Sequence, residues 1–559
     1  MMNLTRFPLG KQFNIFHSKR PINRPALTEF YHHRSFSQQT ILQNSKSSNI
    51  IKSFESDKVS FPCIDQIEER SKTLLDHQRN KQKDQSNRNL SNQNLGSNLN
   101  QQSSSSSIGP EPIYSNLSSS SSKSDYKTFN YTKTFELDYG QSLPEFTLTY
   151  ETWGNLSKSK DNVILLHTGL SANSHAKSHP SNPKSIGWWE NFIGYGSKYP
   201  IDLNKYYLIC VNVLGSCFGS TGPSSINPKT KSAYATNFPI ITIFDIVRTQ
   251  FKLLDELGIE KVFASVGSSM GGMQSIAATW LFPERVGKLI SISGCGRSAP
   301  SSIALRYAQR SVLMSDPNWN RGFYYDKIPP HVGMKLARQI ATITYRSGPE
   351  WEQRFGRKRQ DLKPPNQSPQ KQQKVKGLNP PVLCPDFLIE KYLDHQGEQF
   401  CLKYDANSLI YLSKAMDLFD MTTEGIKELT TFRNQQDLPP LIPEPTLNTT
   451  NPNPNPSPIT TTTTTTKYKS YVSSLPINHL NIVNSLSNTF QKLNSHPILI
   501  LGIQSDLLFP INQQRELAES FRLIGNQNVS YYELDSPFGH DTFLIDLTGV
   551  GGAIRGFLS

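Results

Sequence analysis

The residues Gly267-Ser-Ser-Met-Gly271 form a G-x-S-x-G motif, and Ser269 at its centre is a candidate nucleophile. A β-prone apolar run, 261–266, precedes the motif, and a helix-like segment, 273–281, follows it. Strand, motif and helix in this order are typical of a nucleophile elbow, a strained turn that exposes the serine hydroxyl. The backbone N–H of Met270 would lie at a helix start, where it can stabilise an oxyanion. The pattern predicts acyl chemistry on Ser269, although a Gly-rich turn can also produce it by accident.

A nucleophilic serine needs a histidine base and an acid that orients the base, and with this elbow their chain order is Ser, acid, His. Asp506 and His540 each follow a late apolar run, in expected loops at strand ends. We predict that His540 Nε2 takes the Ser269 proton and that Asp506 fixes the tautomer and stabilises the imidazolium. A turn aspartate and a loop histidine are the plainer interpretations, and Asp541 and Asp546 are rival acids beside or beyond the histidine.

The second oxyanion donor should come from the loop after the apolar run 162–167, at Gly169 or Leu170. His167 and His175 flank this loop. Because a later histidine already fits the role of base, we interpret both as packing or polar loop residues.

The six cysteines show no CxxC pair and no paired spacing, which argues against a zinc site and against a disulfide framework. Cys217 lies in Gly215-Ser-Cys-Phe-Gly219, which could mimic an elbow with a thiol nucleophile. The sequence Ser-Thr-Gly-Pro-Ser-Ser that follows cannot begin a helix. We therefore favour a loop that lines the site or has a structural role.

The elements that would position these residues alternate between strands and helices. Strands are expected at 146–152, 162–167, 206–213, 261–266, 288–293, 497–502 and 529–534, with helices at 239–257, 273–281 and 513–524. Continuously apolar strands that alternate with helices imply a mostly parallel sheet covered on both faces, which is the α/β-hydrolase layout.

A long stretch between the strands 288–293 and 497–502 shows helical segments but no convincing strand. Helices are expected at 304–314, 333–345, 405–418 and 423–429. We predict a helical cap, 298–490, inserted between two parts of the core, 127–297 and 491–559. Such a cap would close the site and exclude water.

Polar low-complexity segments, expected to be disordered, occupy 41–126 and interrupt the cap near 358–381 and 434–466. The chain of 559 residues has a net charge of +13. No basic stripe with interleaved aromatic residues runs through the folded part, which argues against nucleic-acid binding. No apolar run reaches about 18 residues, so no membrane span is expected.

Residues 1–40 are rich in arginine and lysine and contain one acid, Glu29. A basic, acid-poor and mildly amphipathic leader is typical of a mitochondrial transit peptide, which predicts a matrix location. A solvated basic tail on a cytoplasmic protein is the alternative.

The chain resembles the homoserine O-acetyltransferase family and its serine O-acyltransferase branch, which have the α/β-hydrolase fold. The matching segments are 150–154, 214–228, 238–250, 267–274, 315–320, 333–346 and 539–541, together with Asp506. Two loops depart from the family pattern: His167-Thr-Gly-Leu-Ser171 replaces His-Ala-Leu-Thr-Gly, and Gly215-Ser-Cys217 replaces Gly-Gly-Cys. The first departure leaves the second oxyanion donor open.

The resemblance implies two-step acyl transfer, in which Ser269 attacks an acyl-CoA thioester and an amino-acid hydroxyl then attacks the acyl-serine. It implies that Arg338 binds the α-carboxylate and that Asp541 receives the α-ammonium. A helix-surface salt bridge and a loop cap are the plainer roles of these two residues.

The fungal mitochondrial members that the chain resembles are associated with O-acylation of serine for cysteine synthesis. We therefore expect L-serine as acceptor, with acetyl-CoA or succinyl-CoA as donor and co-substrate, and no cofactor or metal held permanently. The alternatives are a homoserine O-acetyltransferase of methionine synthesis, an esterase or thioesterase, and a non-catalytic module. The family's homodimers make a dimer a further expectation.

Overall fold

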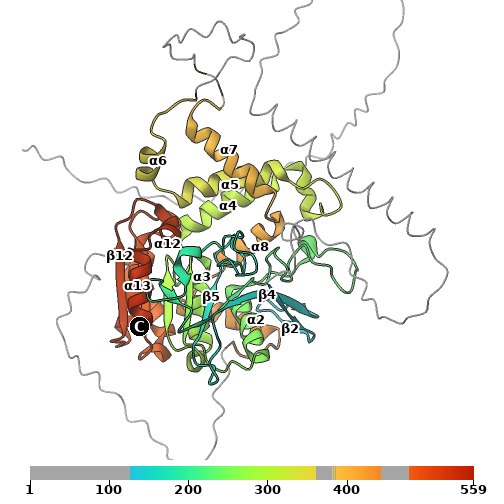
Figure 1. The fold of residues 1–559 in the computed structure, drawn as a ribbon. Helices are drawn as coiled ribbons and strands as arrows, with labels where there is room; N and C mark the ends of the chain where they lie inside the picture. Colours follow the sequence, from blue (N-terminus) through green and yellow to red (C-terminus); the bar gives the residue numbers. More distant parts are fainter. Residues whose placement is uncertain (1–125, 361–380, 382, 384, 442–476) are drawn as a thin grey trace, which may run out of the picture. The chain divides into compact units, whose positions relative to one another are not determined.

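The computed structural model describes residues 126–360, 381, 383, 385–441 and 477–559 (Figure 1). The expected leader, nearly all of the polar segment after it, and most of the two expected insertions lie outside these residues. Within the described ranges, no helix has both the length and the hydropathy that a membrane crossing requires.

One sheet of eight strands runs through the described chain in the order β1-β4-β8-β5-β9-β10-β11-β12. Its strands are β1 (Lys127–Tyr131), β4 (Phe146–Trp153), β5 (Val163–His167), β8 (Tyr207–Val211), β9 (Ala264–Ser268), β10 (Leu289–Ile292), β11 (Ile498–Ile503) and β12 (Val529–Leu534). The neighbours from β8 to β12 pair in parallel, which confirms the mostly parallel sheet expected from the sequence. The pairs β1–β4 and β4–β8 are antiparallel, a feature that apolar runs cannot reveal because they carry no direction.

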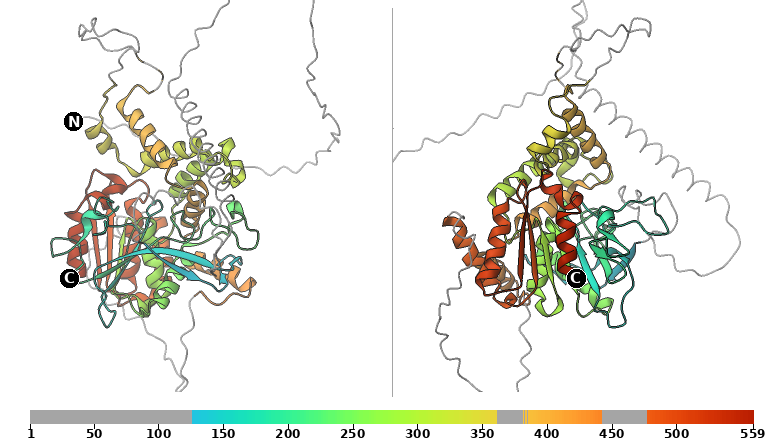
Figure 2. Two further views of the ribbon diagram at one scale, coloured as in Figure 1. Left: turned by 45° about the vertical axis from the view of Figure 1, so that its right-hand side comes forward. Right: turned by 60° about the vertical axis from the view of Figure 1, so that its left-hand side comes forward.

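Two cores lie on opposite faces of this sheet. In β5, Val163 and Leu165 belong to one core, and Ile164 and Leu166 to the other. The first core includes α2 (Ile243–Glu256), α3 (Met270–Leu281) and α11 (Ile511–Leu523), and the second includes α13 (Gly549–Leu558). The views in Figure 2 show helices on both sides of the strands. Each fully buried aliphatic side chain contributes about 1.5–3 kcal/mol, so both faces anchor the sheet.

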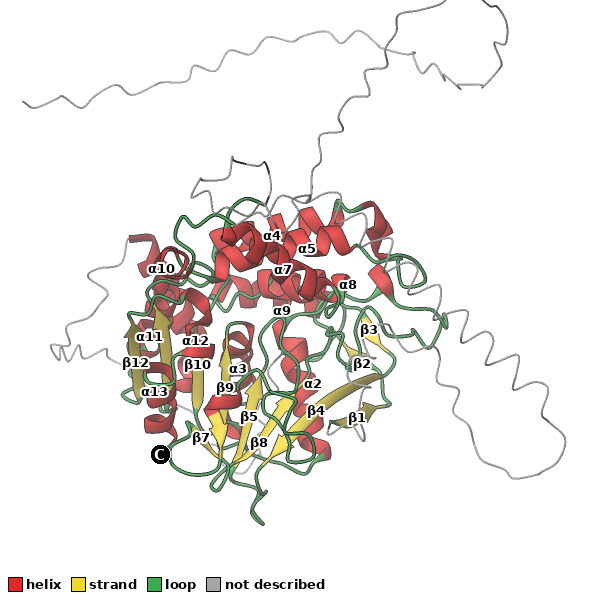
Figure 3. Ribbon diagram, turned by 45° about the horizontal axis from the view of Figure 1, so that its top comes forward, coloured by secondary structure: helices red, strands yellow, loops and turns green. Residues whose placement is uncertain are grey.

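The described residues between β10 and β11 form helices and no strand, as expected. These helices are α4 (Pro300–Met314), α5 (His331–Tyr345), α6 (Gly348–Arg354), α7 (Leu388–Cys401), α8 (Ala406–Asp417), α9 (Thr423–Gln435) and α10 (Ile477–Thr489). In Figures 1 and 3, α4, α5 and α7 lie side by side above the sheet. They lie within the range 298–490, where the sequence analysis expected a helical cap, whereas Leu429 of α9 and Leu486 of α10 belong to the first core.

Helix α7 was not among the expected helices, and its packing explains why. It packs along α5, and Gly397 lies in its interior at the contact. A Cβ atom on Gly397 would lie 2.8 Å from the carbonyl oxygen of Lys335, so only glycine permits this approach. An interior glycine weakens helix propensity by roughly 0.5–1 kcal/mol and so weakens the sequence signal. An ion pair between Lys335 Nζ and Asp394 Oδ1, 2.8 Å apart, also joins the two helices.

The turn between β9 and α3 depends on backbone atoms packed directly against each other. A Cβ atom on Gly267 would lie 2.0 Å from the carbonyl oxygen of Gly271, and one on Gly271 would lie 2.4 Å from that of His167. Between the two glycines, Ser269 has φ 60° and ψ −126°. This backbone region costs a residue other than glycine about 1–3 kcal/mol, so the surrounding packing must hold it. The sharp strand-to-helix turn expected at the motif is therefore present.

We expect Gly267→Ala to destabilise the fold by about 3 kcal/mol or more, because its methyl group would meet backbone that cannot move aside. Gly552→Ala in α13 is the matched control, since nothing lies within 4 Å of the added Cβ. In a helix this replacement should be neutral or stabilise by up to about 1 kcal/mol. Urea unfolding of both proteins measures the difference, and equal midpoints for the two variants would contradict the proposed packing.

Candidate active site

Asp506 and His540 meet in the loops that follow β11 and β12. Asp506 Oδ2 lies 2.6 Å from His540 Nδ1. Asp506 Oδ1 accepts the backbone N–H groups of Leu508 and Phe509, each at 2.9 Å. Because a carboxylate only accepts hydrogen bonds, Nδ1 is the donor of the pair and Nε2 can take up a proton. This is the arrangement expected of an orienting acid and a base.

His540 is buried, and its charge is set by its neighbours. Burial alone would lower the pKa of His540, but the Asp506 carboxylate, with a contribution from Asp541, raises it above its ordinary value. The ring of Phe509 stacks on the imidazole, with centroids 5.1 Å apart. Among the described residues, Nε2 has no hydrogen-bond partner, which leaves it available to a reacting group.

Ser269 follows β9, and Asp506 follows β11 in the same parallel sheet, so both lie at the carboxyl ends of its strands. Ser269 is 8% exposed, and its backbone N–H donates to the carbonyl of Ile292 at 2.9 Å. The structure forms the contact between Asp506 and His540 but no hydrogen bond between Ser269 Oγ and His540 Nε2. Such contacts are commonly long in free enzymes and tighten when substrate binds.

Two candidate oxyanion donors flank Ser269. Met270 is the first residue of α3, so its N–H has no acceptor within the helix. The loop after β5 passes the same serine, since a Cβ atom on Gly169 would lie 4.0 Å from Ser269 Cβ. Met270, Gly169 and Leu170, the donors expected from the sequence, therefore lie on segments that the fold brings to Ser269.

Side chains from outside the loop hold its carbonyl groups. The carbonyl of Thr168 accepts Gln274 Nε2 at 2.9 Å, and that of Leu170 accepts the hydroxyl of Tyr404 at 2.6 Å. Neither Gln274 nor Tyr404 was a candidate from the sequence. Nothing in the local pattern marks them, because each contact joins segments more than a hundred residues apart.

His167 ends β5 beneath this loop and is fully buried. Its Nε2 lies 2.8 Å from Ser265 Oγ. Burial lowers the pKa of His167 to about 3, so it stays neutral and cannot serve as a base near neutral pH. This agrees with the packing role inferred from the sequence.

Arg338 lies on the cap helix α5 and is sandwiched by aromatic rings. Its guanidinium carbon is 4.4 Å from the ring centroid of Phe400 and 5.0 Å from that of Tyr345. Its Nε is buried without a hydrogen-bond partner among the described residues. Stacking leaves the edge of a guanidinium free for a carboxylate, which suits the role that the resemblance implies.

Asp541 adjoins His540 and pairs with an arginine that sequence reasoning missed. Asp541 Oδ2 lies 3.0 Å from Arg346 Nη2, and Arg346 also pairs with Glu350. Burial raises the pKa of Asp541, and the charges of Arg346, His540 and Arg338 offset part of that rise. Arg338, Arg346, Glu350 and Asp541 therefore form a cluster of opposite charges beside the candidate base, with the exposed Arg354 at its edge, 3.6 Å from Glu350.

Helical spacing could not have identified Arg346. It is the C-cap of α5 and has an extended backbone (φ −100°, ψ 170°), so the direction of its side chain does not follow the face of the helix that carries Arg338. The junction between α5 and α6 also packs on the histidine loop, because a Cβ atom on Gly539 would lie 2.8 Å from the carbonyl oxygen of Tyr345.

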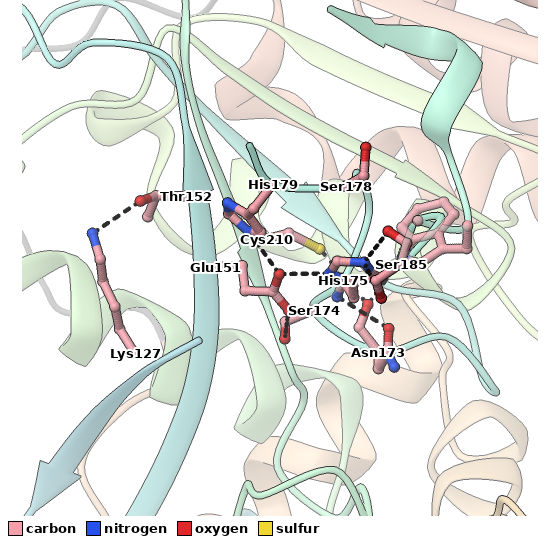
Figure 4. Close-up of polar contacts among 12 residues, drawn as sticks. Lys127, Glu151, Thr152, Asn173, Ser174, His175, Ser178, His179, Ser185 and Cys210 are labelled. Atoms are coloured by element: carbon pink, nitrogen blue, oxygen red, sulfur yellow. Dashed lines mark hydrogen bonds and ion pairs between the residues drawn. The ribbon is translucent and has the colours of Figure 1, made fainter. Parts of the chain in front are cut away.

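Glu151, His175 and His179 form the group of three potential metal ligands identified in the described part of the chain (Figure 4). His175 Nδ1 and His179 Nε2 approach the same oxygen, Glu151 Oε2, at 2.8 and 2.9 Å. Ser174 Oγ donates to the other oxygen at 2.9 Å, and His175 Nε2 lies 2.9 Å from the carbonyl of Ser185.

These contacts describe an ion pair. His175 faces an acceptor on each nitrogen, so it carries both protons. Burial would raise the pKa of Glu151, but hydrogen bonds from His175, His179 and Ser174 lower it to about 2. Metal bonds of about 2.0–2.2 Å at tetrahedral angles would hold ligand atoms roughly 3.4 Å apart, which is wider than these contacts. The contacts of Glu151 with His175 and His179 therefore anchor the segment that follows the loop after β5 to strand β4.

Cys217 is buried against the cap. The backbone N–H of Asp405 donates to its sulfur at 3.4 Å. Burial raises the pKa of the Cys217 thiol far above its usual range, so the reactive thiolate is disfavoured. This supports the structural interpretation of its loop.

Comparison with known proteins agrees with this geometry. Residues 162–376 match the family model of the alpha/beta hydrolase fold. A serine O-succinyltransferase of Emericella nidulans is 48% identical over 553 residues, which cover 97% of this chain and 96% of that protein. A homoserine O-acetyltransferase of Methanococcus vannielii is 36% identical over 433 residues, which cover 78% of this chain and 72% of that protein.

The crystal structure of esterase E22 superposes with a TM-score of 0.58 at 23% identity, over 78% of this chain and 99% of that one, which is a likeness of fold. The high identity to the first relative extends over almost the whole chain. The chain therefore belongs to the homoserine O-acetyltransferase family, which includes serine O-succinyltransferases, and it is an O-acyltransferase with the α/β-hydrolase fold.

Proposed function

We propose that this enzyme transfers a succinyl group from succinyl-CoA to the hydroxyl of L-serine through an acyl-Ser269 intermediate. The name of the relative that matches nearly the whole chain supports serine and succinate over homoserine and acetate. The observation that carries the acceptor class is the ionic cluster beside His540, formed by Arg338, Arg346, Glu350 and Asp541.

In the first proposed step, Ser269 Oγ attacks the thioester carbonyl while His540 Nε2 takes its proton. Asp506 stabilises the imidazolium through the 2.6 Å contact to Nδ1. The N–H groups of Met270 and the Gly169–Leu170 loop hold the oxyanion. The C–S bond then breaks, and the thiolate of CoA leaves with the proton from His540.

In the second step, His540 takes the proton of the L-serine hydroxyl, which attacks the acyl-Ser269 carbonyl. The C–O bond to Ser269 breaks, and Ser269 recovers the proton from His540. O-succinyl-L-serine leaves. No step calls for a metal ion or a resident cofactor.

Charge is the argument for an amino-acid acceptor. An amino acid is a zwitterion, and the cluster offers it an arginine edge for the carboxylate and Asp541 for the ammonium. Each charge of the zwitterion is thus buried against an opposite charge, whereas an unpaired buried charge would cost several kcal/mol. An esterase transfers the acyl group to water, which carries no charge. The ionic cluster would therefore have no function in an esterase with this triad.

We further propose that the product serves cysteine synthesis. Acylation turns the hydroxyl of serine into a carboxylate leaving group, which a sulfur nucleophile can replace. The basic, acid-poor residues 1–40 support import into the mitochondrial matrix, with a cytoplasmic location as the alternative. A homodimer is proposed from the family alone.

Mass spectrometry and thiol release test the reaction. We expect wild-type protein to release CoA from succinyl-CoA, to carry a succinyl adduct on Ser269, and to form O-succinylserine when L-serine is added. Ser269→Ala should show none of these, with a loss of at least about 10⁴-fold in kcat.

Preference for acetyl-CoA and L-homoserine would contradict the proposal and indicate a homoserine O-acetyltransferase of methionine synthesis. Rapid CoA release without product in the presence of either amino acid would identify a thioesterase. The absence of an adduct on Ser269 with both donors would refute the nucleophile itself.

The acid limb of the pH profile should report His540. The base must be neutral to accept a proton, and its pKa is raised above the ordinary value of about 6.5. We expect kcat/KM for the acyl donor to fall tenfold per pH unit below a midpoint that lies above pH 6.5. A midpoint below 6.5 would contradict the charge environment described for His540.

Removal of the Arg338 guanidinium should weaken binding of the amino-acid acceptor and leave the reaction with the acyl donor unchanged. The loss of a charge-assisted bidentate contact costs about 1.5–3 kcal/mol, so Arg338→Gln should raise KM for L-serine by roughly 10- to 100-fold. The burst of CoA release in the first half-reaction should stay within about twofold of wild type. The control is Arg522→Gln, since Arg522 lies in the last turn of α11, outside the cluster, and pairs with Glu519 at 2.8 Å. Equal effects of the two variants on KM would contradict the role of Arg338.

A further inference from the structure

Tyr404 follows α7 in the cap and reaches the loop after β5. Its hydroxyl donates to the carbonyl oxygen of Leu170 at 2.6 Å, and the side chain is 1% exposed. A tyrosine of the cap is thus hydrogen-bonded to the backbone of the loop that passes Ser269.

This hydrogen bond is one of two that confine a single peptide unit. The carbonyl of Thr168 is held by Gln274 Nε2, and the carbonyl of Leu170 by Tyr404. Because each peptide unit is planar, these bonds fix the planes before and after the Gly169–Leu170 peptide. The N–H of Leu170 belongs to that intervening peptide, so the two bonds restrain the chain on each side of it.

The ring of Tyr404 is itself rigidly placed. It stacks on Phe400 with centroids 5.2 Å apart and meets the edge of Phe218 at 5.6 Å. Its neighbour Asp405 is buried and accepts the hydroxyl of Tyr324 at 2.6 Å. Burial also raises the pKa of Tyr404, so the phenol stays protonated and remains a donor.

We infer that Tyr404 is a positioning residue that holds the N–H of Leu170 as the second oxyanion donor. The inference rests on the proposed function, because it requires an oxyanion on the Ser269 acyl group. Leu170 is favoured over Gly169 because the Gly169 N–H shares a planar peptide with the Thr168 carbonyl. That carbonyl points to Gln274 on α3, so the Gly169 N–H points away from the helix that begins beside Ser269. Tyr404 acts through the loop and does not touch the reacting atoms.

Tyr404→Phe removes the hydroxyl and keeps the ring. Loss of an oxyanion donor costs about 10²–10³ in kcat, so loss of its support should cost less, about 5- to 20-fold. We expect this fall in the rate of CoA release from succinyl-CoA, with KM for L-serine within about twofold of wild type. The rate of Ser269 modification by a fluorophosphonate should fall by a similar factor, because its P=O oxygen occupies the same oxyanion site.

Tyr411→Phe is the matched control. Tyr411 lies on α8, is buried, and donates to the carbonyls of Thr236 and Phe238 at 2.9 and 2.7 Å. This variant also loses a buried phenol hydroxyl, so it should show a similar change in thermal midpoint but wild-type fluorophosphonate kinetics. If Tyr404→Phe and Tyr411→Phe react with the probe at equal rates, the inference is wrong.

Phe218→Leu provides a second variant if Tyr404→Phe does not fold. It loosens the packing of Tyr404 and keeps the hydroxyl, so the same rate should fall by a smaller factor, and an unchanged rate would count against the inference. Wild-type protein that resists the fluorophosphonate at Ser269 would overturn the proposed nucleophile and this inference with it. A reactive wild type with an equally reactive Tyr404→Phe would overturn the inference alone.

Discussion

The structure depends on the contact of backbone with backbone at the turn between β9 and α3. A Cβ atom on Gly267 would collide with the backbone of Gly271, and a Cβ atom on Gly271 would collide with the backbone of His167 at the end of β5. This packing holds Ser269 at a positive φ that it would otherwise avoid. The start of α3, the N–H of Met270 and the neighbouring loop are thereby fixed relative to the hydroxyl.

Most of the core could be predicted from the sequence because its strands are buried on both faces. A strand such as β5 or β11 is continuously buried. Most such runs are next in sequence to a segment whose apolar residues have helical spacing. The antiparallel edge could not be predicted, since β1 alternates exposed and buried residues and an apolar run has no direction. Helix α7 escaped notice because Gly397, which its packing on α5 requires, lowers its helix propensity.

Some residues of the candidate site could likewise be predicted from the sequence, and others could not. Asp506 and His540 could be anticipated because parallel strands end at one edge, so residues directly after them gather there. Arg346 was missed because it follows the last residue of α5, where its extended backbone ends the helical spacing from Arg338. Tyr404 could not have been found, since it is one of 22 tyrosines and its partner lies more than 200 residues away in the chain. Contacts that depend on long-range packing leave no local pattern to read.

The difference between transfer and hydrolysis on this fold comes from what surrounds the base. An acyl-serine that waits for an amino acid must not lose its acyl group to water, so the acceptor has to gain more from the site than water can. In the proposed function the ionic cluster would supply that difference, because its pairs of opposite charge complement a zwitterion and offer little to a neutral molecule. Asp541 links the two demands, since it adjoins His540, pairs with Arg346, and contributes to the raised pKa of the base. Binding of an ammonium at Asp541 would reduce that contribution and lower the pKa of His540, which favours the neutral imidazole at the moment when the acceptor hydroxyl must give up its proton.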